Sequence, residues 1–307
     1  MERKVYAIGE TVLDIIFDAG QVIAAKPGGA MLNSSVSLGR AGVNVSFITE
    51  FGHDQTGNLI LGFLEKNRVC TQNIHQYIDG KTPLAMAFLN EKGDAGYDFY
   101  KPYPPERLKV KIPDFQSSDI LLFGSFFGID PNVRKKLLEI VKAAHKSGSL
   151  IVYDPNFRKP HAHELEKLKP FILENIHLAD VIRASNEDAE IIFGENSVQG
   201  LKIAISKKDK VIIMTHSSEK VELASPSINS SYPVKKIKVK STIGAGDNFN
   251  AGLIYGLIKK NVYPADLKNL SSEKWEDIVS YAIDFSANVC MSFDNYISED
   301  FAGKMEH

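Results

Sequence analysis

A turn of small residues that leads into a carboxylate is the part of this chain best suited to chemistry. Residues 242–249 read Thr-Ile-Gly-Ala-Gly-Asp-Asn-Phe, and Phe249, Leu253 and Leu257 recur every fourth residue, which predicts a helix that begins at the turn. The unpaired N–H groups and the positive dipole end of a helix N-terminus attract an anion, and glycine lets the backbone approach that anion closely. Asp247 lies in the first helical turn and can accept a proton. The stretch therefore predicts an anion site with a general base beside it.

An ordinary helix start is the competing interpretation, because a glycine turn followed by an acidic residue begins helices in many proteins. A second glycine-rich helix start far upstream favours the chemical interpretation. Gly28 and Gly29 precede a run of small and apolar residues, and Asn33 lies one turn later. A pair of glycines brings backbone donors close to a polar ligand.

These two segments, in this order and at this separation, resemble the two signature motifs of the ribokinase-like (PfkB) carbohydrate kinases. Further stretches resemble an opening strand with a substrate aspartate, a G-x-D-x-x-G turn, two lid strands and a D-x-N-x-R stretch, at residues 9–14, 52–57, 82–88, 99–101 and 153–158. The resemblance covers nearly the whole chain. It is closest to fructokinases because of the opening at 9–10 and the lid stretch at 99–101.

The resemblance implies an α/β fold of three layers, in which a central, mostly parallel sheet is flanked by helices and carries a small β-sheet lid. Apolar runs and helical periodicities alternate along the chain in the same rhythm, with short strand-like runs at 74–77, 84–90 and 97–100 and turn glycines at Gly80 and Gly93. We expect one kinase domain over residues 1–307, with lid strands at approximately 11–26 and 73–103. The polar residues just past predicted strand ends should meet at one edge of the sheet: Asn156, Ser185, Thr215 and Gly244.

The activity implied by the resemblance is transfer of the ATP γ-phosphoryl group to a sugar hydroxyl, with fructose to fructose 6-phosphate as the first choice. Asp247 would act as general base, and the N–H groups of Ala245, Gly246 and Asp247, in the turn that begins at Gly244, would form the anion hole. The remaining sugar hydroxyls would be held by Asp14, Gly28, Gly29, Asn33, Lys101 and Arg158. For Lys101 and Arg158, an equally weighted interpretation is that they are surface cations without a role in substrate binding.

The nucleotide would lie along Ser185, Thr215, Ser217, Gly244, Gly246 and Asn288, with Mg²⁺ held indirectly by Asp188 or Glu187. The nucleotide- and metal-binding motifs depart from the family pattern. Ser241 stands where the family has an aspartate associated with a monovalent cation, which argues against potassium activation. Ser185 and Asp188 replace the amide and the longer acid of the N-x-x-E motif, and residues 215–220 lack both glycines of the T-x-G-x-x-G motif.

Composition narrows the class of protein. A formal net charge of −2 over 307 residues gives no electrostatic footprint for nucleic acid. Cys70 and Cys290 show no metal-ligand or paired spacing, and no N-terminal apolar run has the length of a signal peptide or membrane span. We therefore expect a cytoplasmic protein that binds neither nucleic acid nor membrane. Exposed lid strands predict a homodimer formed through the lid.

Several alternatives stay open. Another ketose, an aldose, a sugar acid or a nucleoside would use the same catalytic parts, and a nucleoside would need a larger, aromatic-lined lid pocket. A phosphosugar would need additional cations, which Lys101 and Arg158 could supply. A catalytically silent sugar- or nucleotide-binding regulator is the alternative of another class, because the metal and nucleotide motifs are altered, but the intact Asp247 argues against it. A dinucleotide-dependent dehydrogenase is disfavoured because no G-x-G-x-x-G follows the first strand.

Overall fold

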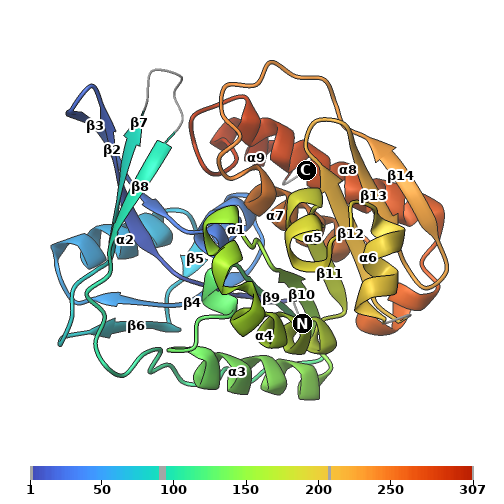
Figure 1. Cartoon of the computed structure of the whole chain (residues 1–307), viewed down its shortest axis with the longest axis horizontal. Coiled ribbons are helices and arrows are strands. Elements are labelled where there is room, and N and C mark those ends of the chain that lie inside the picture. The colour runs from blue at the N-terminus through green and yellow to red at the C-terminus, as the bar shows by residue number, and fades with distance from the viewer. Residues whose placement is uncertain (1–2, 90–94, 207–208, 306–307) are drawn as a thin grey trace.

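A computed structural model describes residues 3–89, 95–206 and 209–305, and Figure 1 shows a large sheet with a small separate sheet beside it. The large sheet has the strand order β14-β13-β12-β11-β10-β9-β1-β4-β5, and β6 pairs with β4. Its strands are β1 (Val5–Ile8), β4 (Val45–Gly52), β5 (Val69–Cys70), β6 (Ile74–Tyr77), β9 (Ile120–Gly124), β10 (Leu150–Asp154), β11 (Val181–Ser185), β12 (Val211–His216), β13 (Lys220–Ala224) and β14 (Asn229–Pro233). All its pairings are parallel except those that join β12, β13 and β14.

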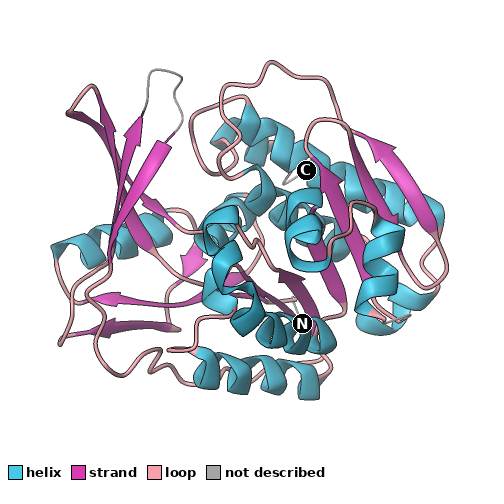
Figure 2. Ribbon diagram, in the orientation of Figure 1, coloured by secondary structure: helices cyan, strands magenta, loops and turns pink. Residues whose placement is uncertain are grey.

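Helices cover both faces of the large sheet, as Figure 2 shows. On one face lie α1 (Ala30–Arg40), α2 (Gln55–Lys66), α7 (Ala245–Lys259), α8 (Ser272–Cys290) and α9 (Glu299–Gly303). On the other lie α3 (Arg134–Ser147), α4 (Leu165–Leu178), α5 (Asn186–Phe193) and α6 (Val198–Ile205). Among the described residues there are also three short 3₁₀ helices: η1 (Phe126–Gly128), η2 (Lys159–Glu164) and η3 (Pro264–Lys268). None of the helices described is long and apolar enough to cross a membrane.

The strand sequences explain the three layers. Val5 and Ala7 of β1 belong to the core on one side of the sheet, whereas Tyr6 and Ile8 belong to the core on the other side. Every residue of β1 is buried, because helices cover both faces to which successive side chains point. The strands β9 and β10 show the same continuous burial and are apolar except at their last residues, and β4 is buried throughout although it contains Ser46, Thr49 and Glu50. The predicted three-layer α/β fold is confirmed.

The small sheet is the lid. Its strand order is β3-β2-β7-β8, from β2 (Val12–Asp18), β3 (Gln21–Gly28), β7 (Leu84–Leu89) and β8 (Ala95–Tyr100). The strands β2 and β3 form a hairpin, and β7 and β8 pair antiparallel. The predicted turn at Gly93 lies outside the described residues.

Two strand predictions were wrong. Ile74–Tyr77 was assigned to the lid range 73–103, but β6 pairs parallel with β4 in the large sheet. Alternation over four residues reveals a strand without revealing which sheet it joins, because pairing is decided by tertiary contacts. Residues 236–240 alternate charged and apolar residues, a pattern that predicts a strand, yet they form none and lie in the loop between β14 and α7.

Candidate active site

A glycine turn delivers a carboxylate to the N-terminus of α7. Gly244 caps α7 with a φ of +78°, and a Cβ there would lie 2.8 Å from the carbonyl oxygen of Asn295, so conformation and space both favour glycine. Gly246 and Asp247 follow in the first turn, where backbone N–H groups have no partner within the helix. The N–H of Ala245 bonds back into the turn, 3.2 Å from its acceptor. The predicted anion hole therefore has two N–H donors left for a ligand.

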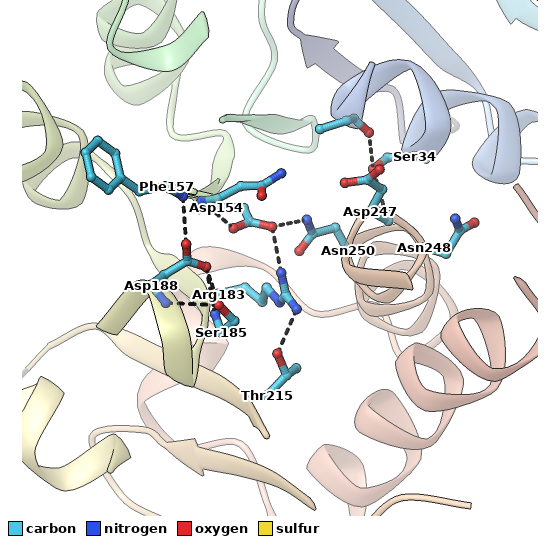
Figure 3. Close-up of polar contacts among 12 residues, drawn as sticks. Ser34, Asp154, Phe157, Arg183, Ser185, Asp188, Thr215, Asp247, Asn248 and Asn250 are labelled. Carbon is cyan, nitrogen blue, oxygen red and sulfur yellow. Dashed lines mark hydrogen bonds and ion pairs between the residues drawn. The ribbon is translucent and has the colours of Figure 1, made fainter. Parts of the chain in front are cut away.

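The two signature segments meet where α1 packs against α7. Asn33 Nδ2 donates to Oδ2 of Asp247 at 2.8 Å, and Ser34 Oγ donates to the backbone carbonyl of Asp247 at 2.7 Å. Figure 3 shows Ser34 approaching Asp247 from the neighbouring helix. Ser34, Ser35 and Ser37 are fully buried, and such small side chains let the two helices approach closely. Asp247 is held by α1 and is only 6% exposed.

Asp247 opens into a pocket of about 270 Å³ beneath the lid, which we call the lid pocket. Of the residues predicted from the sequence, its lining includes Asp14, Gly29, Asn33, Lys101, Arg158, Gly244 and Asp247. Asn33 contributes a buried Oδ1 that has no hydrogen-bond partner among the described residues. A buried polar atom without a partner indicates a place where a ligand can donate a hydrogen bond.

The Gly28–Gly29 pair makes room for Asp14. A Cβ on Gly28 would lie 2.0 Å from Oδ2 of Asp14, which lies on the paired strand β2 two residues beyond Val12, the register partner of Gly28. Gly29 has a φ of +137°, and a Cβ there would lie 2.3 Å from the carbonyl oxygen of Glu10. These glycines therefore let the lid carboxylate and the start of α1 share one small space.

Burial sets the proton affinity of both pocket carboxylates. It raises the pKa of Asp247 to about 6, against the hydrogen bond from Asn33 and the charge of Arg158. It likewise raises the pKa of Asp14 to about 6, against the charges of Lys26 and Arg158. A carboxylate whose pKa lies near 6 is ionised at neutral pH and is a stronger base than an exposed aspartate.

The two predicted pocket cations differ in how they are held. Lys101 Nζ lies 2.9 Å from Oε2 of Glu10, whose other carboxylate oxygen accepts from the hydroxyl of Tyr103. Arg158 is exposed, and its charge acts on both Asp14 and Asp247. Lys101 is thus paired by the protein, whereas Arg158 faces the carboxylates that would surround a ligand.

A second, smaller pocket of about 120 Å³ lies on the other side of the same turn, and we call it the turn pocket. Ala245 and Gly246 line it, with Thr215 and Ser217 from the end of β12. Ser286 and Ala287 of α8 line it too, while the predicted Asn288 does not and instead accepts a hydrogen bond from the N–H of Ser298. The turn is therefore shared: Gly244 and Asp247 face the lid pocket, and the two residues between them face the turn pocket.

Arg183 of β11 is the charged residue of the turn pocket lining. Figure 3 shows its guanidinium between two strand ends: one nitrogen lies 3.0 Å from Oδ2 of Asp154, and the other donates to Thr215 Oγ1 at 2.7 Å. Asn250 Nδ2 donates to the same oxygen of Asp154 at 2.6 Å. A Cβ on Gly246 would lie 2.9 Å from the Arg183 guanidinium. This buried network thus fixes a cation directly beside the helix N-terminus.

Comparison with known proteins identifies the family. The family model described as pfkB family carbohydrate kinase matches residues 2–298. The chain belongs to this family. A curated relative, the fructokinase of Vibrio alginolyticus, is 25% identical over 291 residues, which cover 94% of this chain and 91% of the relative.

Two solved structures show that the fold of this PfkB-family kinase is shared. A double mutant of the fructokinase from Vibrio cholerae O395, in a form with fructose, ADP and potassium ion bound, has a TM-score of 0.85 at 22% identity and covers 99% of this chain and 98% of its own. Aminoimidazole riboside kinase from Salmonella enterica, complexed with aminoimidazole riboside and an ATP analogue, has a TM-score of 0.82 at 19% identity and covers 99% and 100%.

The two candidate metal carboxylates of this family member have different surroundings. Asp188 is the third residue of α5 and forms a capping box with the N-cap Ser185. Its Oδ1 accepts from the N–H of Phe157 at 2.7 Å, and its Oδ2 accepts from the N–H and hydroxyl of Ser185. Burial and the nearby Asp154 raise the pKa of Asp188. Glu187 is exposed and pairs with Lys159 at 2.9 Å. No group of three or more His, Cys, Asp or Glu side chains that could hold a metal occurs within the described ranges.

The kinase site contains residues that the sequence did not single out, above all Arg183, Asp154 and Asn250. Asp154 was visible as the first residue of the D-x-N-x-R stretch, and its position after an apolar strand was a usable signal. Arg183 lies inside strand β11, where a buried charge is unusual and indicates a paired position. Asn250 lies three residues beyond Asp247 and faces the same site from α7.

Proposed function

We propose that this PfkB-family kinase transfers the γ-phosphoryl group of ATP to a hydroxyl of a neutral sugar, with fructose as acceptor and fructose 6-phosphate as product. One observation supports this most: a single helix N-terminus separates two pockets, with Asp247 on one side and Gly246 beside Arg183 on the other. An acceptor in the lid pocket and a triphosphate in the turn pocket would meet at that helix end. The site has the base, the N–H donors and the cation that phosphoryl transfer requires.

In the proposed reaction Asp247 accepts the proton of the attacking hydroxyl. Its pKa near 6 leaves it ionised at neutral pH, and the bond from Asn33 aims the carboxylate. The N–H groups of Gly246 and Asp247 would stabilise the charge on the transferring phosphoryl oxygens, because they project from a preorganised helix end. Closure of the lid would exclude water, which is a competing acceptor.

Hydrogen bonds would orient the acceptor. Asp14 supplies a carboxylate that accepts from hydroxyls, and the unpaired Oδ1 of Asn33 accepts one more. Three carboxylates, from Glu10, Asp14 and Asp247, line the lid pocket against two cations, and Lys101 is already paired with Glu10. This excess of negative charge favours a neutral sugar over a sugar acid or a phosphosugar.

An aromatic lining favours a second candidate acceptor, an aryl riboside. Tyr97 and Phe99 of the lid stack at 5.8 Å between ring centroids, and Phe126 and His161 stack at 4.2 Å in the body, and all four line the lid pocket. Aromatic faces hold a planar base by stacking as well as they hold the apolar face of a sugar. A riboside therefore belongs in any test of the acceptor.

We assign the nucleotide phosphates to the turn pocket, with Arg183 as their cation and with Thr215 and Ser217 beside them. Ser185 neighbours Thr215 in the strand register. The candidate groups for Mg²⁺ are the carboxylates of Glu187 and Asp188, which would act through water. They fit this ion because Mg²⁺ is usually bound by one or two carboxylates together with substrate phosphates. Bound there, Mg²⁺ would screen the charge of the triphosphate.

The decisive experiment measures ADP release from ATP and Mg²⁺ with purified protein and a panel of acceptors: fructose, other ketoses, aldoses, sugar acids, phosphosugars and ribosides. Turnover with fructose above all others would support the proposal, and preference for a riboside would replace the acceptor while keeping the reaction. Binding of sugar or ATP without turnover across the panel would establish the silent regulator instead.

We also propose a domain organisation, an oligomeric state and a compartment for this chain. The chain would act as one catalytic unit whose lid strands cover its own site. The lid face opposite Asp14 carries the exposed rings of Phe88 and Tyr100 and is the surface through which we expect a homodimer to form. The free thiols of Cys70 and Cys290 suit a reducing compartment such as the cytoplasm.

A further inference from the structure

The lid is tied to the body by one lysine at each edge of its sheet. The edge strands are β3 and β8, and the inner strand β2 carries Asp14. At one edge Lys26 of β3 donates from Nζ to the backbone carbonyl of Phe293 at 2.6 Å. At the other edge Lys101, the residue after β8, pairs with Glu10 at 2.9 Å. Both lysines therefore join the lid to residues outside it.

The segment that Lys26 reaches is the one that packs against the catalytic turn. Two residues after Phe293, the carbonyl oxygen of Asn295 accepts from Asn248 Nδ2 at 2.8 Å. The same carbonyl lies where a side chain on Gly244 would be, 2.8 Å from an added Cβ. The N–H of Ile297 then donates to Ser37 Oγ at 3.1 Å, and this hydroxyl in turn donates to Asn248. Segment 293–297 is thus bound to α1 and to the start of α7.

Lys26 also stands opposite Asp14 in the hairpin register. Lys26 therefore links the two halves of the site: its backbone pairs with the strand that carries Asp14, and its ammonium group donates to the segment that supports the anion hole. Lys101 reaches a different part of the body, since Glu10 follows β1, accepts from Tyr103 and has its carbonyl oxygen against Gly29 at the start of α1. The two edges of the lid differ in what they reach.

We propose that Lys26 is a positioning residue that couples lid placement to the catalytic turn through the carbonyl of Phe293 and segment 293–297. The inference rests on the proposed kinase function, because the coupling matters only if the acceptor binds under the lid. Without the link, the lid keeps its fold, but it no longer fixes the acceptor against Asp247 and Gly244. Phosphoryl transfer then suffers more than acceptor binding does, because small displacements of reacting groups are costly.

The test compares Lys26→Met with Lys26→Arg, which keeps the charge and can still donate to the carbonyl. Lys268→Met is the matched control, because it removes one charge from an exposed lysine outside the lid. Phe293→Ala is the second control, because it removes the exposed ring and leaves the carbonyl acceptor. With fructose and ATP, we expect Lys26→Met to lower kcat about 10-fold with a smaller change in KM for fructose. Lys26→Arg and both controls should keep kcat within about twofold of the wild type.

A kcat for Lys26→Met within about twofold of the wild type would overturn the proposal, as would a loss confined to KM. Hydrogen exchange of the unliganded protein separates this failure from failure of the kinase assignment. Lys26→Met, but not Lys268→Met, should speed exchange in both β3 and segment 293–297, because the link ties them together. Unchanged exchange in the second segment would refute the coupling even if the wild type phosphorylated no acceptor tested.

Discussion

The lid pocket and the turn pocket share one helix N-terminus but are built in different ways. In the lid pocket, side chains from two separate motifs bond directly to each other, as Asn33 does to Asp247. In the turn pocket, residues 215–220 lack the two glycines of the T-x-G-x-x-G motif. Arg183 is fixed there by bonds to Asp154 and Thr215, which come from the two neighbouring strands. The acceptor side thus depends on local motif residues, and the donor side depends on tertiary contacts. Substitutions in the two pockets should therefore change activity and stability in different combinations.

The largest effect should come from Asp247→Asn. The amide keeps the shape and can still accept from Asn33, but it cannot take the hydroxyl proton, so kcat should fall by roughly 10³-fold. Fructose binding, measured by calorimetry, should change little. A variant with near-normal turnover would remove Asp247 from the role of general base.

The same variant should be more stable than the wild type at pH 7. The folded-state pKa of Asp247 is raised from 3.8 to about 6, so ionisation in the folded protein costs up to about 3 kcal/mol. This cost appears as pH rises from about 4 and is complete above about 6, and the neutral amide avoids it. Thermal unfolding at pH 7 should show a gain that vanishes near pH 4, and loss of stability at pH 7 would contradict the burial argument.

Arg183→Met should lower activity and stability together, whereas Asp247→Asn should lower activity and raise stability at pH 7. It leaves Asp154 buried without its cation, and breaking such a pair typically costs 3–5 kcal/mol. We expect kcat/KM for ATP to fall about 100-fold, while KM for fructose changes less.

A double variant separates the two losses. Adding Asp154→Asn to Arg183→Met removes the unpaired charge, so chemical denaturation should show much of the stability restored. Turnover should stay low, because the cation beside Gly246 is still missing. If turnover recovered along with stability, Arg183 would be a structural residue only.

The contrast also explains what the sequence could predict. Asp247, Asn33 and the glycines were identifiable because short motifs specify local backbone geometry, and the structure brings them together as expected. Arg183 was not, because its partners Asp154 and Thr215 come from two other strands and only the sheet order makes them neighbours. Periodicity likewise located β6 but not the sheet that it joins.

A smaller, pH-dependent effect should sharpen the comparison on the acceptor side. Asp14 and Asp247 both have pKa values near 6 and both must be ionised, so kcat/KM for fructose should fall below pH 6 with a limiting slope that approaches two. In Asp14→Asn we expect about a 10-fold higher KM for fructose and a limiting slope of one, because one titrating group is gone. A slope of two in that variant would mean that another group, and not Asp14, titrates with Asp247.

The smallest effect should come from potassium. Ser241 replaces the family aspartate at the turn, and its hydroxyl accepts a hydrogen bond from the N–H of Ile243 at 3.2 Å. A neutral oxygen already engaged in the turn attracts a monovalent cation less than a carboxylate does. Turnover in potassium and in a bulky organic cation of equal ionic strength should agree within about twofold, and Ser241→Asp should create a potassium dependence. Strong activation of the wild type by potassium would show that backbone carbonyls around the turn are enough to hold the ion. The nucleotide side of the site would then resemble the acceptor side, because both would depend on local backbone geometry.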